Sequence, residues 1–165
     1  MKALIVVDMQ NDFIDGSLGT PEANAIVENV RELVDSGIYD RIIYTRDTHG
    51  TNYLETFEGR HLPVEHCIKD THGWKISNKL NLSSAEIIDK PTFGYTKWKD
   101  KLQDCESIDI VGLCTDICVI SNALILRAIY PDVEISIIKN ATAGTTPSKK
   151  QSALDVALSC QINVI

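Results

Sequence analysis

Short apolar runs rich in β-branched residues alternate with helical patterns along almost the whole chain. The strand-like runs occupy residues 2–7, 41–45, 86–89, 107–113, 133–138 and 162–165. Helical spacing of apolar residues marks 21–37, 97–103, 116–129 and 148–159. Apolar strands that alternate with helices are typical of a mostly parallel sheet covered on both faces. We therefore predict one α/β domain over residues 1–165, a doubly wound, mostly parallel six-stranded sheet with helices on both faces.

The charge balance narrows the kinds of partner that this chain would bind. It has 16 Lys and Arg against 23 Asp and Glu, a net charge of −7, which argues against a nucleic-acid backbone or an anionic membrane. No apolar run approaches the roughly 18–20 residues of a membrane span. The opening MKALIVVDMQNDF turns acidic and lacks a small-residue cleavage site, so it reads as a strand rather than a signal peptide.

The cysteines bear on the compartment. There are five of them, an odd number without CxxC spacing, as is typical of reduced thiols in the cytosol. We expect a cytoplasmic protein that acts on a small molecule. The sequence leaves self-association into a homo-oligomer open.

Several chemically active residues follow the predicted strands directly. In an open parallel sheet, ligands bind beyond the carboxyl ends of the strands. The residues at these ends are Asp8, Asp47 with His49, Lys90, and the segment from Cys114 to Cys118. We therefore expect them to meet at one edge of the sheet.

Cys118 lies in GLCTDICV, on the turn that leads from a strand into a predicted, fully buried helix. The positive end of a helix favours thiolate, and the same turn can direct backbone N–H groups at an oxyanion. Asp8 would accept the thiol proton, and Lys90 would stabilise the thiolate. The alternatives are a buried structural cysteine, a turn-capping Asp8 and a surface Lys90; a metal site on Cys114 and Cys118 is a further one.

Residues 47–85 form a long segment with weak periodicity that contains all four histidines. A segment of this length inside a compact domain is usually functional or disordered, and its histidines and aromatic residues favour a functional segment. Asp47 and His49 form an Asp-x-His pair, and alternation along an extended chain places both side chains on one side. A distant histidine would complete a metal site, whereas His72 is expected to be solvated.

Three motifs together resemble the isochorismatase-like cysteine hydrolases. They are DMQNDF after the first strand, DKPTFGYT around Lys90, and GLCTDICV before a helix. The segment RDTHGTNY…EGRHLPVEHC…GW is similar to the metal-binding segment of nicotinamidases. The resemblance extends over essentially the whole chain and implies the isochorismatase-like hydrolase fold.

The resemblance implies a catalytic triad of Asp8, Lys90 and Cys118. In the family mechanism the thiolate attacks an amide carbonyl, ammonia leaves, and water hydrolyses the thioester while Asp8 shuttles protons. The family also has a cis peptide bond before the nucleophile, here between Leu113 and Cys114. It turns the backbone N–H of Cys114, beside that of Cys118, toward an oxyanion hole.

The resemblance also implies a metal held by Asp47, His49 and His66. A fourth ligand would come from Glu58 or His61, and we prefer Glu58. Mixed nitrogen and oxygen ligands suit Zn²⁺, with Fe²⁺ or Mn²⁺ as alternatives. The metal would bind the pyridine nitrogen of nicotinamide.

Aromatic residues near the triad are candidates to bind a planar ring. We expect Phe13 and Tyr95 to flank it, and Trp74 to be either a pocket wall or a packing anchor. Some nicotinamidases have an aromatic residue just before the last metal-binding histidine, where this chain has Leu62 and Pro63.

The resulting hypothesis is a metal-dependent amidohydrolase that converts nicotinamide to nicotinate and ammonia in NAD salvage. The alternative is another amide or ureido hydrolase of the superfamily that needs no metal. A non-catalytic binding protein with the same fold is a third hypothesis, against which the intact triad argues.

Overall fold

Six parallel strands form one sheet in the order β3-β2-β1-β4-β5-β6. The structure is a computed structural model that describes residues 1–165. The strands are β1 (Lys2–Val7), β2 (Arg41–Asp47), β3 (Glu86–Lys90), β4 (Ser107–Leu113), β5 (Glu134–Ala143) and β6 (Asn163–Val164). The predicted α/β sheet is therefore confirmed, and every pairing in it is parallel. The strand order changes direction between β1 and β4, the position at which open α/β sheets bind ligands.

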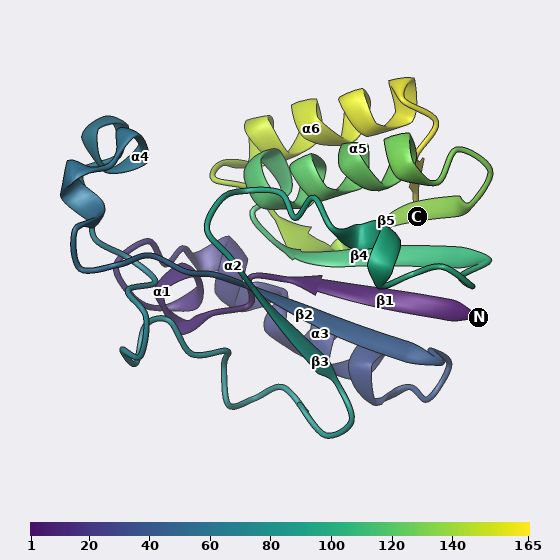
Figure 1. The fold of residues 1–165 in the computed structure, drawn as a ribbon, viewed down its shortest axis with the longest axis horizontal. Coiled ribbons are helices and arrows are strands. Elements are labelled where there is room, and N and C mark those ends of the chain that lie inside the picture. Colours follow the sequence, from purple (N-terminus) through teal and green to yellow (C-terminus); the bar gives the residue numbers. More distant parts are fainter.

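Helices cover both faces of the sheet (Figure 1). α5 and α6 lie on one face, α2 and α3 lie on the other, and α4 stands apart beyond the carboxyl ends of the strands. Their bounds are α1 (Asn11–Ile14), α2 (Pro21–Ala25), α3 (Val27–Asp35), α4 (Phe57–His61), α5 (Ile120–Ile129) and α6 (Pro147–Ser159). Thr20 and Thr146 cap α2 and α6 through their side chains, each with proline as the next residue, as expected at a helix start.

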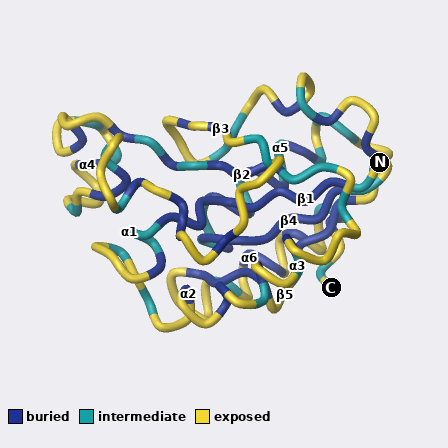
Figure 2. The backbone as a smooth tube through the Cα atoms, turned by 90° about the horizontal axis from the view of Figure 1, so that it is seen from below, coloured by how far each residue is buried: buried dark blue, intermediate teal, exposed yellow.

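β1 shows how the sequence pattern creates two cores. Ala3, Ile5 and Val7 belong to the cluster under α5 and α6, while Leu4 and Val6 belong to the cluster against α2 and α3. All five are fully buried, because side chains alternate between the faces of a strand and both faces are covered. Figure 2 shows the buried strands at the centre of the molecule, with exposed residues on the surrounding helices and turns.

Three predicted helices differ from those observed. The helical pattern 21–37 is divided into α2 and α3 at Ile26, and within 97–103 only a 3-10 turn forms, from Trp98 to Asp100. The pattern 116–129 begins with a π-helical turn, Thr115–Val119, before α5. The prediction that this last helix is buried all round is wrong, because Ala128 is exposed and Ile120 and Leu124 are only partly buried.

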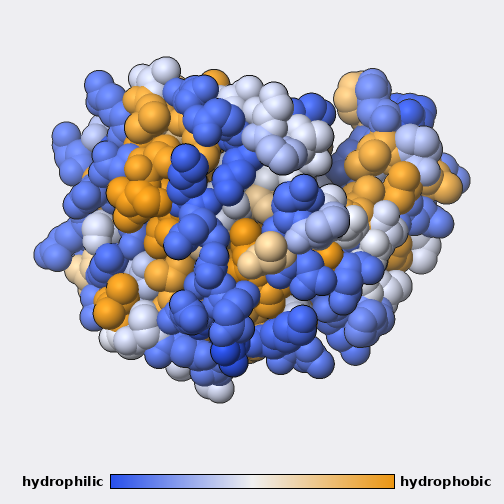
Figure 3. Space-filling model, turned by 180° about the vertical axis from the view of Figure 1, so that it is seen from behind, coloured by the Kyte–Doolittle hydropathy of each residue, from blue (hydrophilic) through white to orange (hydrophobic).

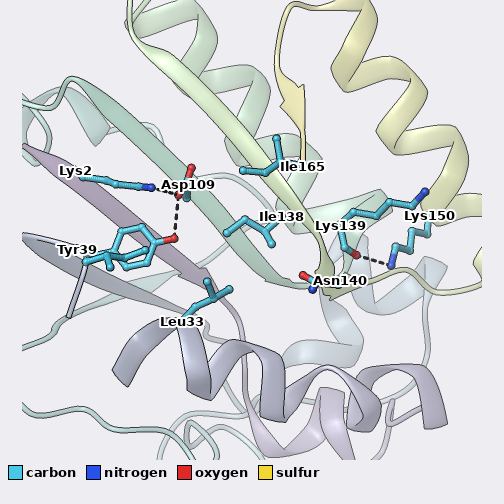
Figure 4. Close-up of a pocket in the computed structure, with 10 residues that line it drawn as sticks. Lys2, Leu33, Tyr39, Asp109, Ile138, Lys139, Asn140, Lys150 and Ile165 are labelled. Atoms are coloured by element: carbon cyan, nitrogen blue, oxygen red, sulfur yellow. Dashed lines mark hydrogen bonds and ion pairs between the residues drawn. The ribbon is translucent and has the colours of Figure 1, made fainter. Parts of the chain in front are cut away.

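An open groove of about 740 Å³ lies between α3 and β5, away from the carboxyl ends of the strands (Figure 4). At one end the carboxylate of Asp109 accepts a hydrogen bond of 2.9 Å from the Tyr39 hydroxyl and pairs with Lys2 at 3.1 Å. Seen from behind, apolar side chains gather toward the end of the molecule where the two termini lie (Figure 3). The groove contains none of the predicted site residues.

No helix of the structure has the length and the apolar character needed to span a membrane.

Candidate active site and metal centre

Asp8, Lys90 and Cys118 come together at the carboxyl ends of the strands. The Lys90 Nζ lies 2.6 Å from Asp8 Oδ2 and 3.6 Å from Cys118 Sγ. Asp8 and Lys90 are fully buried, and Cys118 is 4% exposed. A buried acid, amine and thiol in contact form a set that can exchange a proton and stabilise a charged sulfur.

Hydrogen bonds hold Asp8 to the neighbouring strand β2 and hold Lys90 to the turn that follows it. The Asp8 N–H donates to Thr45 O at 3.1 Å, and the Thr45 hydroxyl donates to Asp8 Oδ1 at 2.6 Å. Lys90 Nζ also donates to Thr92 O at 3.1 Å. These bonds leave Asp8 Oδ2 directed at Lys90, with no other partner in the protein.

The turn between β4 and α5 presents Cys118. The peptide bond between Leu113 and Cys114 is cis, as the resemblance implies. The N–H of Cys114 has no acceptor within the protein, so it remains available to a ligand. Asn122, fully buried one turn further on, donates to Cys118 O at 2.7 Å and fixes the position of the turn.

Gly112 allows this turn to approach β1. Its φ is +109°, and a Cβ at this position would lie 2.1 Å from Val7 O. Only glycine has both the conformational freedom and the space for such an approach. The strand end that precedes the cis bond is therefore packed directly against the strand that carries Asp8.

Burial determines the protonation of the thiol. It raises the pKa of Cys118 well above its usual value, Asp8 raises it further, and Lys90 acts against both. Burial also raises the pKa of Asp8 although Lys90 opposes it. Burial alone would lower the pKa of Lys90, but Asp8, Cys118 and Asp47 together outweigh it, and the pKa is raised. The predicted depression of the Cys118 pKa by the helix end is therefore not found, because burial and Asp8 move this pKa upward.

A second cluster adjoins the first at the end of β2. Asp47, His49, Glu58 and His66 each offer one ligand atom, and these atoms all lie within 4.8 Å of one another. The His49 Nε2 is 2.8 Å from Asp47 Oδ2, and the His66 Nε2 is 3.6 Å from Glu58 Oε1. Two carboxylates and two imidazoles at this spacing suit a divalent metal ion.

Partners of the ligand side chains orient them toward the centre of the cluster. The Nδ1 of His66 is 2.8 Å from Val64 O, which leaves its Nε2 for the other ligands. The rings of His49 and His66 both pack against Tyr53, with centroids 4.7 and 4.9 Å from it. Asp47 Oδ1 is buried without a hydrogen-bond partner and lies 3.8 Å from Lys90 Nζ.

The charges in this cluster act strongly on one another. Burial alone would raise the pKa of Asp47, but hydrogen bonds with His49 and His66 hold it below its usual range. Burial alone would lower the pKa of His66, but hydrogen bonds with Asp47 and Glu58 raise it to about 10. Both shifts have the same cause, because the carboxylates of the cluster favour a positive charge beside them.

A single cavity of about 400 Å³ connects the two clusters. Its lining includes Cys118 and Cys114 on one side and Asp47, Glu58 and His66 on another. Figure 3 shows the segment around α4, which contributes Glu58, separated from the body of the molecule by a notch. A small planar molecule in this cavity could reach both the thiol and a metal ion.

Comparison with known proteins places the chain in a family. The isochorismatase domain matches residues 2–165. The chain belongs to the isochorismatase domain family. It is 24% identical to the nicotinamidase/pyrazinamidase of Mycobacterium tuberculosis over 186 residues, which cover 100% of this chain and 98% of that protein.

Solved structures of isochorismatase-domain relatives superpose over nearly the whole chain. The pyrazinamidase of Pyrococcus horikoshii in complex with zinc gives a TM-score of 0.85 at 29% identity and covers 99% of this chain and 98% of its own. The nicotinamidase PncA from Bacillus subtilis gives 0.83 at 26% identity, with the same two coverages. The family and these relatives indicate a hydrolase that acts on amide bonds.

The three aromatic residues expected near the site have different surroundings in the structure. Phe13 lines the cavity, but Tyr95 does not; it packs edge-on against Trp98, with ring centroids 5.1 Å apart. Phe93, two residues earlier, lines the cavity in its place. Trp74 is a packing anchor, because its Nε1 donates to Thr48 at 2.9 Å and its ring stacks on Arg46.

Two histidines lie outside both clusters. His61, the alternative to Glu58, is exposed and its Nδ1 lies 2.8 Å from Phe57 O. His72 is exposed, as expected. Sequence reasoning did not identify Phe93, Tyr53 and Asn122; of these only Asn122, a polar residue inside a mostly apolar helical pattern, carried a signal.

Proposed function

We propose that this protein is a metal-dependent amidohydrolase that converts nicotinamide to nicotinate and ammonia through a thioester on Cys118. The observation that carries the proposal is the shared cavity, lined by Cys118 and by the ligand residues Asp47, Glu58 and His66. The nicotinamidases and pyrazinamidases among its relatives support it. Since nicotinamide is a breakdown product of NAD, we assign the reaction to NAD salvage in the cytoplasm.

The reaction begins with the transfer of the Cys118 proton to Asp8. The sulfur then attacks the carboxamide carbon, and the backbone N–H groups of Cys114 and Cys118 stabilise the oxyanion. Asp8 returns its proton to the leaving ammonia. It then takes a proton from the water that attacks the thioester, and gives it back to the departing sulfur. Lys90 holds Asp8 in place and balances the negative charge that moves between Asp8 and Cys118.

The second cluster fits a divalent metal. Its donors are two carboxylates and two imidazoles, and Asp47 Oδ1 is buried without a hydrogen-bond partner. When bound, the metal would supply a Lewis-acidic point of attachment for the pyridine nitrogen. Zinc is our first choice, because such donors suit it and a relative was solved with it; iron and manganese are alternatives.

Two phenylalanines provide walls for the pyridine ring. Phe13 and Phe93 both line the cavity, and the Phe13 ring lies 5.5 Å from that of His66. Aromatic contacts of this kind orient a planar ring. They supply the aromatic surface that is missing at Leu62 and Pro63.

One observation favours a second candidate function. Leu62, which lines the cavity, stands near the position at which some nicotinamidases have an aromatic residue. A different amide or ureido hydrolase of the superfamily, with the same triad and no need for metal, therefore remains as the alternative. It differs from the first candidate in retaining full activity after chelation.

Ammonia release from a panel of substrates tests the proposal. The zinc-loaded protein is assayed with nicotinamide, pyrazinamide, ureidoacrylate and biuret, with Cys118→Ala as the blank. We expect release from nicotinamide and pyrazinamide. Release from biuret or ureidoacrylate alone, or undiminished activity after exhaustive chelation, would overturn the nicotinamidase proposal in favour of the second candidate.

A further inference from the structure

Gln10, in the motif DMQNDF, is fully buried and binds the backbone of a metal-ligand residue. Its Oε1 accepts from the Asp47 N–H at 2.7 Å, and its Nε2 donates to Asp47 O at 2.8 Å. The same Nε2 donates to Trp74 O at 2.8 Å. One side chain thus fixes both backbone groups of Asp47 and ties them to Trp74, 27 residues further along the 47–85 segment.

Asp12, two residues later in the motif, holds the other side of the metal cluster. Its Oδ2 accepts from the Cys67 N–H at 2.8 Å, directly after His66. Cys67 has a φ of +50°, a conformation that a non-glycine residue rarely adopts without support. Asp12 also packs closely against Gly73, because a Cβ at Gly73 would lie only 2.1 Å from Asp12 Oδ2. The Asp12 N–H also donates to Gly73 O at 3.0 Å.

We propose that Gln10 and Asp12 are positioning residues for the metal centre, Gln10 through Asp47 and Asp12 through His66. Neither belongs to the cluster of ligand atoms, and neither lines the cavity. The inference rests on the proposed metal site. Its physical reason is that His66 comes from a segment without regular structure, whose ligand position depends on hydrogen bonds to its backbone. Loss of such partners typically weakens metal binding about 10- to 100-fold.

The proposal separates metal binding from the thiol. The Asp8 side chain is held by Thr45 and Lys90, and not by Gln10 or Asp12. Variants of the two positioning residues should therefore bind metal less tightly while the intrinsic reactivity of Cys118 stays the same. General loosening of the fold would change both.

Asp12 offers the sharper test, because it is only partly buried. Zinc affinity is measured by competition with a chelator for wild type, Asp12→Ala and Asp12→Asn. The absorption spectrum of the Co²⁺-loaded forms reports ligand geometry. We expect Asp12→Ala to bind zinc about 10- to 100-fold more weakly, with a changed Co²⁺ spectrum. Asp12→Asn should stay within about threefold of wild type, because its amide oxygen accepts the same N–H.

Two controls keep the proposal falsifiable. Asp15→Ala, an exposed acid at the end of the same helix, should leave zinc affinity unchanged, and Cys118 alkylation should stay within about twofold in every metal-free variant. Gln10→Met tests the Gln10 hydrogen bonds with an apolar side chain of similar size. If this variant does not fold, the comparison of Asp12→Ala with Asp12→Asn still tests the proposal. Wild-type affinity in Asp12→Ala, equal loss in Asp12→Asn, or faster Cys118 alkylation overturns the inference alone. No zinc binding by wild type overturns the proposed metal centre itself.

Discussion

The two groups of residues that share the cavity are positioned in different ways. We call Asp8, Lys90 and Cys118 the thiol group, and Asp47, His49, Glu58 and His66 the metal group. Asp8 follows β1 directly, Lys90 ends β3, and Cys118 lies on the short turn after β4. In the metal group, Asp47 ends β2 and His49 follows it closely, whereas Glu58 and His66 come from the long segment between β2 and β3. The strand ends and one short turn, held by Asn122, position the first group. The second also needs hydrogen bonds to the long segment, and this difference predicts which changes affect which function.

The largest expected effect is on the thiol group. Cys118→Ala should reduce ammonia release from nicotinamide more than about 10³-fold, since it removes the nucleophile and so the covalent route. Metal content and the unfolding temperature should stay near wild type, because Cys118 contributes nothing to the metal cluster. The measurement is a steady-state assay with Cys160→Ala, at the end of α6 and outside the cavity, as the matched control. Residual activity above one-tenth of wild type would refute the covalent mechanism.

The same difference explains what the sequence could predict. Strand ends are marked by short apolar runs, so the convergence of Asp8, Lys90, Asp47 and Cys118 followed from the parallel topology alone. The choice between Phe93 and Tyr95 did not, because it depends on Asn122 in α5. That one buried amide donates to Phe93 O at 3.1 Å and accepts from the Tyr95 N–H at 2.9 Å. A contact between positions 27 to 29 residues apart leaves no local pattern.

Two other predictions from the sequence differ from the structure, and both differences arise from tertiary contacts. The division of the helical pattern at Ile26, between α2 and α3, interrupts no apolar periodicity. A lowered pKa of Cys118 was predicted from its place before a helix, whereas burial next to Asp8 raises this pKa. Local position gives the direction of a helix dipole, but burial is a property of the whole fold.

The next largest effect is on the metal group. His49→Ala should impair metal binding and leave the reactivity of Cys118 nearly unchanged. Loss of a ligand should remove most of the bound metal, about one ion per chain in wild type, and lower nicotinamide turnover by about 10²-fold. Intrinsic alkylation of Cys118 should change less than about twofold. Metal content is measured by elemental analysis, and His72→Ala, an exposed histidine of the same segment, is the control. Parallel losses of metal binding and thiol reactivity would show that the two groups are not independent.

Removal of metal from the wild type should make the 47–85 segment more susceptible to proteolysis and leave the sheet unchanged. Because Glu58 and His66 lie in this segment, chelation should raise proteolysis between Gly50 and Gly73. Cleavage sites are identified by mass spectrometry, with and without zinc. Equal cleavage in both states would contradict the idea that the metal orders the segment.

The pH dependence of thiol alkylation tests how far burial controls the first group. Burial and Asp8 raise the pKa of Cys118 above its usual value, so little thiolate exists at neutral pH without substrate. The rate of iodoacetamide alkylation at Cys118 should therefore rise about tenfold per pH unit and still be rising above pH ~9. Site-resolved mass spectrometry at a series of pH values gives the profile. A plateau below pH ~7 would show that Lys90 and the helix end outweigh burial.

The smallest effect concerns the cavity wall shared by both groups. Phe93 lines the cavity and is 41% exposed, whereas Tyr95 packs on Trp98 outside it. Loss of one aromatic contact with a ring costs about 0.5–1.5 kcal/mol, so Phe93→Ala should raise KM for nicotinamide roughly 2- to 10-fold and change kcat little. Tyr95→Ala is the matched control and should leave KM unchanged. If Tyr95→Ala raised KM and Phe93→Ala did not, the ring would bind on the side first expected from the sequence, and the cavity would not be the substrate site.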